Sequence, residues 1–188
     1  MRKLVIEKEA VRSNMAVIRK RAAGAALYGV LTGDAGGAGL VPMARMLRNE
    51  GVNRFAVGSA EEAQALREAG FLEEEILMLR ATVDREELEH LVDLNVVCTI
   101  SSVDTGLALN AVAENRATIA EAHIQVDTGM GFGGFLVGEP EKILLAYRSL
   151  PNVALSGIYT QLHTTGRGQE VEGQLQQFHQ VLDAVHAA

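Results

Sequence analysis

The chain has 188 residues, of which 48% are hydrophobic, so it is long enough to bury a sizeable core within one domain. Its 17 basic and 24 acidic side chains give a net charge of −7, which argues against general binding to nucleic acid or to an anionic membrane. The single cysteine, Cys98, excludes an internal disulfide. No apolar run approaches the roughly 20 residues of a membrane span, and the N-terminus becomes charged too early for a signal peptide, so we expect a cytoplasmic protein.

Short apolar runs alternate with longer segments of helical period along the chain. The apolar runs predict six strands, at 26–31, 54–57, 76–79, 96–100, 122–126 and 153–162. A helix is expected after each strand, and a first helix precedes them with Val11, Met15 and Ile18 on one face. This alternation indicates βαβ units and a parallel sheet. Periodicity alone does not separate an open doubly wound sheet from part of a closed (βα) barrel.

Capping residues mark where several of the predicted helices begin. Ser59, with Glu62 three residues later, has the pattern of a capping box, and Ser101 or Ser102 is a second N-cap. Pro140 falls in the first turn of its helix, where proline is tolerated. The last helix is expected to have one apolar side, formed by Val171, Leu175, Phe178, Leu182 and Val185.

Two glycine-rich loops each follow a predicted strand. Loop 33–39 precedes a helix, so its backbone N–H groups could hold a phosphate at the helix N-terminus, or its glycines could simply allow a tight turn. Loop 129–134 matches the pattern G-x-G-x-x-G, but the next helix is expected only near Pro140. A dinucleotide-binding loop opens a helix at once, so we do not interpret this loop as one.

Four stretches of the chain share their order and residue pattern with one known family. They are 10–15, 54–70, 126–131 and 157–160, and the third reads Val126-Asp127-Thr128-Gly129-Met130-Gly131. In order, they resemble the first helix, the second βα unit, the Asp-Thr-Gly-Met-Gly signature and the sixth strand of the alanine racemase family. The resemblance is to its N-terminal domain, the barrel of a fold-type-III pyridoxal phosphate enzyme, and it covers essentially the whole chain.

The resemblance implies an α/β fold, a partial TIM-type barrel of about six βα units, with residues 1–188 forming one domain. The family's last barrel units supply phosphate-binding groups and an arginine partner for the pyridine nitrogen, and its β-rich C-terminal domain supplies a catalytic tyrosine. We expect all of these to be missing from this chain. Six units would leave the first and sixth strands as open edges, which predicts a homo-oligomer or a partner chain that supplies the missing units.

The resemblance ends at four positions that face the cofactor in the family. Thr32 stands where the family has the lysine that forms the Schiff base, and Gly36 stands where a tyrosine contacts the phosphate. Phe132 replaces an arginine near the cofactor ring, and the family's Thr-His-Phe becomes Thr-Gln161-Leu, with a histidine displaced to His163. A Schiff base requires a primary amine, which threonine lacks. No catalytic residue is therefore assigned.

The remaining candidates for contact with a small-molecule ligand are placed by the resemblance at the C-terminal ends of the strands. The set is Thr32, Gly36, Asp127, Gly131, Phe132, Gln161 and His163. Asp127 could act in a site or brace the second glycine loop, and His163 forms a polar cluster with Thr164 and Thr165. Cys98 is expected in the core, and no metal is expected because the histidines lack metal-ligand spacing.

Three functional hypotheses remain open. The first is a degenerate relative of the racemase barrel that is noncatalytic alone and does not hold pyridoxal phosphate as the family does. The second is a truncated or split pyridoxal-phosphate-dependent racemase that is active only with its missing part. The third is a binding module whose glycine loops hold a small anion or metabolite.

Overall fold

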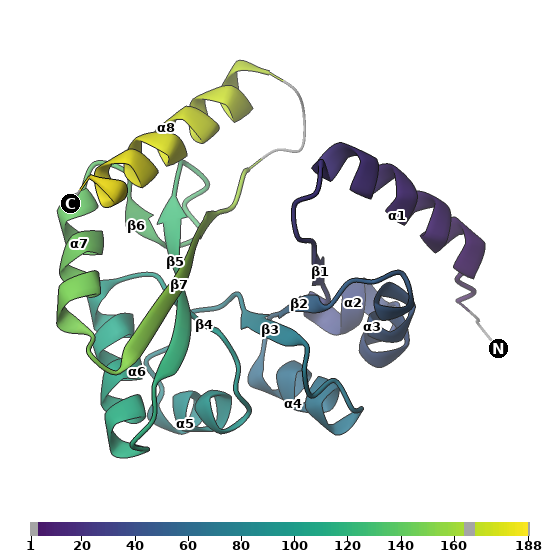
Figure 1. The fold of residues 1–188 in the computed structure, drawn as a ribbon, viewed down its shortest axis with the longest axis horizontal. Helices are drawn as coiled ribbons and strands as arrows, with labels where there is room; N and C mark the ends of the chain where they lie inside the picture. Colours follow the sequence, from purple (N-terminus) through teal and green to yellow (C-terminus); the bar gives the residue numbers. More distant parts are fainter. Residues whose placement is uncertain (1–3, 164–167, 188) are drawn as a thin grey trace. The chain divides into compact units, whose positions relative to one another are not determined.

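The computed structural model describes residues 4–163 and 168–187. The chain divides into two compact units, Met1–Arg80 and Ala81–Ala188, and each unit has its own parallel sheet with helices between the strands (Figure 1). The six predicted strands are all present, three in each unit. No helix among the described residues is long and apolar enough to cross a membrane.

The first unit carries a three-stranded sheet in the order β1-β2-β3. Its elements are α1 (Lys8–Ala22), β1 (Tyr28–Val30), α2 (Thr32–Gly37), α3 (Leu40–Asn49), β2 (Arg54–Val57), α4 (Ala60–Glu68) and β3 (Glu75–Met78). The register places Gly29 opposite Phe55 and Phe55 opposite Ile76. Phe55 is fully buried and meets the ring of Phe71 edge-on at 5.4 Å, which centres the core of this unit on β2.

The second unit is built around its longest strands. Its elements are α5 (Arg85–Asp93), β4 (Cys98–Ile100), α6 (Val103–Asn115), β5 (Ala120–Asp127), β6 (Phe135–Leu136), α7 (Pro140–Ser149), β7 (Val153–Thr160) and α8 (Gln169–His186). Strand β5 pairs with β4, β6 and β7, and every pairing is parallel. β6 was not predicted, because two residues are too short to show a period. Pro140 begins α7 as expected.

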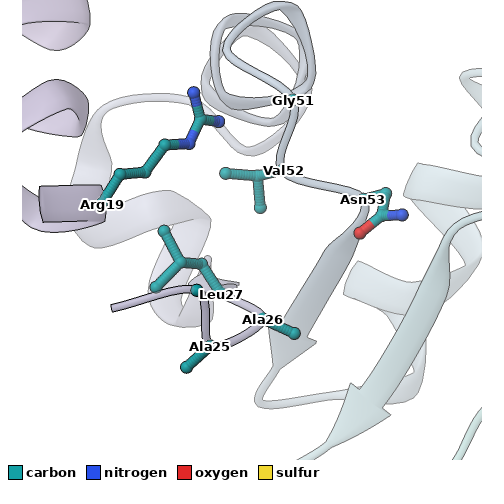
Figure 2. Close-up of a pocket in the computed structure, with 8 residues that line it drawn as sticks. Arg19, Ala25, Ala26, Leu27, Gly51, Val52 and Asn53 are labelled. Carbon is teal, nitrogen blue, oxygen red and sulfur yellow. The ribbon is translucent and has the colours of Figure 1, made fainter. Parts of the chain in front are cut away.

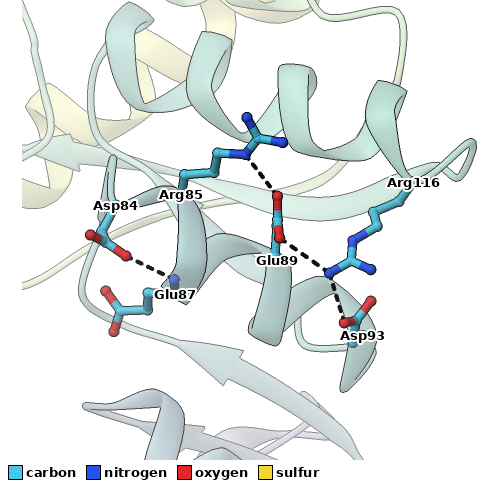
Figure 3. Close-up of polar contacts among 6 residues, drawn as sticks. All are labelled: Asp84, Arg85, Glu87, Glu89, Asp93 and Arg116. Atoms are coloured by element: carbon cyan, nitrogen blue, oxygen red, sulfur yellow. Dashed lines mark hydrogen bonds and ion pairs between the residues drawn. The ribbon is translucent and has the colours of Figure 1, made fainter.

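Helices of the second unit begin and pack through identifiable polar contacts. Ser102 caps α6 as predicted, in a full capping box with Thr105, because each side chain accepts the backbone N–H of the other. An ion-pair cluster links α5 to the end of α6 (Figure 3). In it, the Glu89 carboxylate lies 2.8 Å from Arg85 and 3.4 Å from Arg116. The hydrogen bond from Arg85 is the main cause that lowers the pKa of Glu89.

The two outer strands of the chain each have a single partner among the described residues of their own unit. β1 pairs with β2, and β7 pairs with β5 from Val153 to Thr160. The second edge of each strand therefore carries backbone groups that no strand of its own unit pairs with.

Candidate functional site

The loop that follows β1 has a left-handed backbone. Gly33, Asp34, Ala35 and Gly36 have φ angles of 63°, 56°, 55° and 66°, so the segment α2 is a left-handed turn and not an ordinary helix. This conformation costs about 1–2 kcal/mol for each residue that carries a Cβ. The surrounding structure must therefore hold Asp34 and Ala35 in place.

Two carboxylates hold this turn. Glu62 of α4 accepts the backbone N–H of Asp34 through Oε1 at 2.9 Å and that of Gly58 through Oε2 at 2.8 Å. Asp34 in turn accepts the N–H of Leu40, at the start of α3, through Oδ1 at 2.7 Å. The turn is thus tied to the β2–α4 connection by one carboxylate and to α3 by the other.

The predicted capping box at the start of α4 forms only by half. Ser59 accepts the N–H of Glu62 at 3.3 Å, as the pattern predicted. The Glu62 carboxylate does not return to Ser59; it bonds to Gly58 and Asp34 instead. A local sequence pattern could not reveal this, because Asp34 lies 28 residues away along the chain.

Thr32 and Gly36 lie at the two ends of the left-handed turn. The Thr32 side chain is half-buried, and its methyl carbon lies 3.3 Å from the position that a Cβ on Gly58 would take. Gly36 is exposed, and a Cβ added there would meet nothing within 4 Å. Space alone would therefore admit a side chain at position 36, but the positive φ opposes one.

Asp127 braces the second glycine loop. Its Oδ1 accepts the backbone N–H groups of Gly129 at 2.9 Å and of Gly131 at 3.0 Å. The loop then passes close to β5, since a Cβ on Gly134 would lie 2.8 Å from the backbone N of Asp127. This approach lets β6 pair with the end of β5, and it leaves Phe132 71% exposed. Of the two roles considered for Asp127, the bracing role is the one that the hydrogen bonds display.

The two glycine loops therefore share an electrostatic feature. Several of their backbone N–H groups already donate to the chain's own carboxylates, those of Glu62 and Asp127. The first N–H of α3 likewise donates to Asp34. An anion bound at these particular N–H groups would have to displace the carboxylate oxygens and would meet their negative charge at short range.

A buried polar cluster joins β5, β7 and α8, and we call it the Gln174 cluster. Gln174 is 5% exposed and Thr128 is 3% exposed. Gln174 Oε1 lies 2.6 Å from Nδ1 of His163, and Gln174 Nε2 donates to Thr128 Oγ1 at 3.3 Å. Thr128 and Thr160 share a hydrogen bond of 2.8 Å. Each buried polar group of the cluster thus has a partner, as burial requires.

Gln174 was missed by the sequence analysis, although a signal for it exists. It lies one helical turn from Val171 and from Phe178, within the stripe predicted to be apolar. A polar residue in such a stripe is usually either exposed or hydrogen-bonded in the interior, and Gln174 is hydrogen-bonded. Leu175, which was predicted to lie on the apolar side of this helix, is 39% exposed.

His163 contacts the chain's own residues through both ring nitrogens. Nδ1 faces Gln174 and Nε2 lies 3.2 Å from Glu170 Oε2. Hydrogen bonding to Gln174 and then to Glu170 raises the pKa of His163. The other candidate on this strand, Gln161, is exposed. Thr164 and Thr165, expected beside His163, lie outside the described residues.

The remaining reactive side chains give no second candidate. Cys98 is buried in β4, and burial raises the pKa of its thiol to about 12, which fits the expected core role. Within 4–163 and 168–187, no three His, Cys, Asp or Glu side chains are grouped so as to hold a metal ion.

The candidate residues fall into two sets. Thr32 and Gly36 lie with Glu62 in the first unit, while Asp127, Gly131, Phe132, Gln161 and His163 lie in the second. A single site formed by both sets stays a prediction. A pocket of the first unit, lined by residues that include Arg19, Leu27 and Val52, lies beside the N-terminal ends of β1 and β2 and contains none of the candidates (Figure 2).

Comparison with known proteins finds similarity to one family over most of the chain. The family model described as alanine racemase, N-terminal domain, matches residues 6–188. Alanine racemase from Desulforamulus reducens is 34% identical over 161 residues, which cover 85% of this chain and 43% of that protein. Alanine racemase from Carboxydothermus hydrogenoformans is 35% identical over 152 residues, which cover 81% of this chain and 40% of that protein. The chain thus spans less than half the length of these relatives.

Solved structures show the same fold. Alanine racemase from Clostridium difficile 630 superposes with a TM-score of 0.83 at 24% identity, covering 94% of this chain and 47% of that one. Alanine racemase from Streptomyces lavendulae gives a TM-score of 0.85 at 23% identity, covering 97% and 48%. With its parallel strands and intervening helices, the chain has the expected α/β fold, a partial TIM-type barrel.

Proposed function

Because the chain belongs to the alanine racemase N-terminal domain family, we propose that it is a degenerate member that is noncatalytic alone. The family depends on pyridoxal phosphate, which supplies its chemistry as an imine with a lysine. One observation carries the proposal: Thr32 directly follows the loop end of β1 and begins α2, and the resemblance puts the family's lysine at this position. A hydroxyl cannot form an imine, so the residue at this position does not fit a covalently held cofactor.

The other lysines do not replace the missing amine. Lys8 and Lys20 lie on α1, before the first strand. Lys142 lies on α7, where its Nζ is 2.7 Å from a carboxylate oxygen of Glu139. Lys3 lies outside the described residues. Lys142 lines a pocket beside Ser101 and Ser102, which follow β4, but no described lysine lies on a strand or directly after one.

The Asp34 carboxylate supports the same proposal at the first glycine loop. It accepts the first N–H of α3, so a phosphate at this helix start would meet its negative charge. For the same reason the third hypothesis, a small-anion binding module, has less support than the first. A neutral or cationic small molecule remains compatible with these loops.

Borohydride reduction tests the proposal directly. The purified chain is incubated with pyridoxal phosphate, reduced and mapped by peptide mass spectrometry. We expect no stoichiometric pyridoxyl group at a single lysine. Thr32→Lys is the matched variant, because it supplies the amine and changes nothing else; reduction at position 32 in this variant alone would show that the surroundings still admit the cofactor. A stoichiometric pyridoxyl-lysine in the unchanged chain would refute the proposal.

The missing lysine also predicts that the purified chain has no racemase activity. Positioned acid and base groups each contribute about 10²–10⁴-fold to proton transfer, and the chain lacks the lysine that the family would use. We expect no alanine racemisation by the purified chain in a coupled assay for D-alanine. Turnover that copurifies with the chain and persists in a host strain without its own racemases would contradict this expectation.

The edges of β1 and β7 support a second proposal, that the chain works in an assembly. These edges can pair with a second copy or with a partner chain that carries further βα units, as a split racemase would require. Light scattering over a dilution series tests whether the chain self-associates. A monomer with one sharp melting transition at every concentration would exclude the homo-oligomer, and mixing with a C-terminal racemase fragment would then test the split enzyme.

A further inference from the structure

The orientation of the Gln174 side-chain amide is fixed by a neighbouring backbone group that can only donate a hydrogen bond. The backbone N–H of His163 points to Gln174 Oε1 at 3.3 Å. A backbone N–H only donates, so the amide atom that faces it must be the oxygen. The alternative orientation, with the amide nitrogen at this place, would set two donors, the backbone N–H and the amide NH₂, against each other. This contact therefore fixes which amide atom is the oxygen and which is the nitrogen, a choice that the shape of the amide group alone does not settle.

The orientation of Gln174 in turn decides the protonation of His163. Nδ1 of His163 lies 2.6 Å from the same Oε1, so Nδ1 must carry a proton to form this hydrogen bond. Nε2 lies 3.2 Å from a carboxylate oxygen of Glu170, which also accepts. A neutral imidazole has only one N–H, and both of its nitrogens here face acceptors. Only the imidazolium satisfies both contacts.

The far side of Gln174 connects this histidine to the turn after β5. Gln174 Nε2 donates to Thr128, which shares a hydrogen bond with Thr160 of β7. Thr128 directly follows Asp127, whose carboxylate braces the second glycine loop. The cluster thus links the start of α8 to the second glycine loop, which contains the candidates Gly131 and Phe132.

We infer that His163 is a pH-sensitive clasp, which in its protonated form holds the first turns of α8 against the turn at Thr128. Glu170 is the one charged group of the described residues with a recorded contact to the ring, and Gln174, Thr128 and Thr160 are neutral. Deprotonation at Nε2 would leave its lone pair facing the Glu170 carboxylate. Deprotonation at Nδ1 would leave its lone pair facing the oxygen of Gln174. Either loss weakens the link between α8 and the loop.

The direction of the pH effect follows from linkage. The pKa of His163 is raised in the folded chain, above the ordinary value of about 6.5. The clasp is therefore fully formed below about pH 6.5 and is lost as the pH rises through the higher folded-state pKa.

Hydrogen exchange of the full chain tests the clasp. Protection factors of amides at 170–176, corrected for intrinsic exchange, are compared at about pH 5.5 and about pH 8.5. We expect a loss of about two- to fivefold at the higher pH, the range that a partly exposed ion pair gives. His163→Gln and Glu170→Gln should remove this pH dependence. His179→Gln, which removes another titrating histidine of the same helix, should keep it.

A second measurement does not depend on how the helix opens. The ring protons of His163 are titrated by NMR in the unchanged chain and in Glu170→Gln. We expect the apparent pKa to fall toward its ordinary value in the variant, while Glu172→Gln, which removes the same charge two residues away, leaves it higher. An unshifted pKa in the unchanged chain, or protection at 170–176 that changes with pH equally in His163→Gln, would overturn the inference.

Discussion

Removing the Glu62 carboxylate should release the left-handed turn after β1. Glu62 accepts two backbone N–H groups, from Asp34 and Gly58. A hydrogen bond to a charged group contributes about 1.5–3 kcal/mol, and the exposed Asp34 N–H regains water when its partner is lost. We therefore expect Glu62→Ala to lower the free energy of unfolding by about 2–3 kcal/mol. Glu62→Gln keeps one acceptor but turns an NH₂ toward a backbone donor, so it should cost about 1–2 kcal/mol.

Urea unfolding measures the change in stability, and hydrogen exchange at 33–37 shows whether the turn itself opens. Glu86→Gln is the matched control, because it removes the same charge from the first turn of another helix, α5, at an exposed position and should cost less than about 0.5 kcal/mol. Equal destabilisation by Glu86→Gln and Glu62→Gln would refute the reasoning, since the effect would then come from charge near a helix N-terminus and not from the two hydrogen bonds. Unchanged exchange at 33–37 in Glu62→Ala would refute it as well.

Three further predictions concern the second unit. Gly134→Ala should lower stability by at least about 3 kcal/mol in thermal unfolding, because its Cβ would lie 2.8 Å from backbone atoms at a φ of 118°. The control Gly138→Ala adds its Cβ in open space and should cost little. Ser102→Ala should cost about 1 kcal/mol in urea unfolding, since it removes the N-cap of α6. Cys98, with a pKa of about 12, should resist thiol reagents at about pH 8 in the folded chain and react only under denaturing conditions.

Most of the fold could be predicted because it depends on local patterns. The six longer strands are apolar runs between turn signals, and Ser102 and Pro140 mark helix starts by local chemistry. β6 escaped prediction because its two residues pair with β5 only through the close approach at Gly134. The left-handed turn escaped prediction as well. Glycines permit such a conformation, but what holds it here is Glu62, from another helix.

The positions of candidate site residues could be predicted where a sequence motif set the alignment. The role of a residue could not be predicted where it depends on a partner that is distant in the sequence. The absence of an amine at position 32 could be read from the sequence, because the neighbouring pattern sets the alignment. The role of Asp127 could not, because a carboxylate after a strand can either meet a ligand or brace a loop. Gln174 and its link to His163 depend on the packing of α8. Only the fold brings them together.

The carboxylates that accept hydrogen bonds at the two glycine loops give different information about the function of the chain. Asp127 belongs to the Asp-Thr-Gly-Met-Gly signature, so its bracing of the second loop is compatible with cofactor-dependent relatives and says nothing specific about this chain. In the first loop, Glu62 likewise belongs to a stretch shared with the family, 54–70, whereas Asp34 lies between Thr32 and Gly36, where the resemblance ends. Backbone N–H groups left without a phosphate need other acceptors when they are withdrawn from water. Under the proposed function, Thr32 and the Asp34 carboxylate, which accepts the first N–H of α3, would let this loop keep its form without the cofactor.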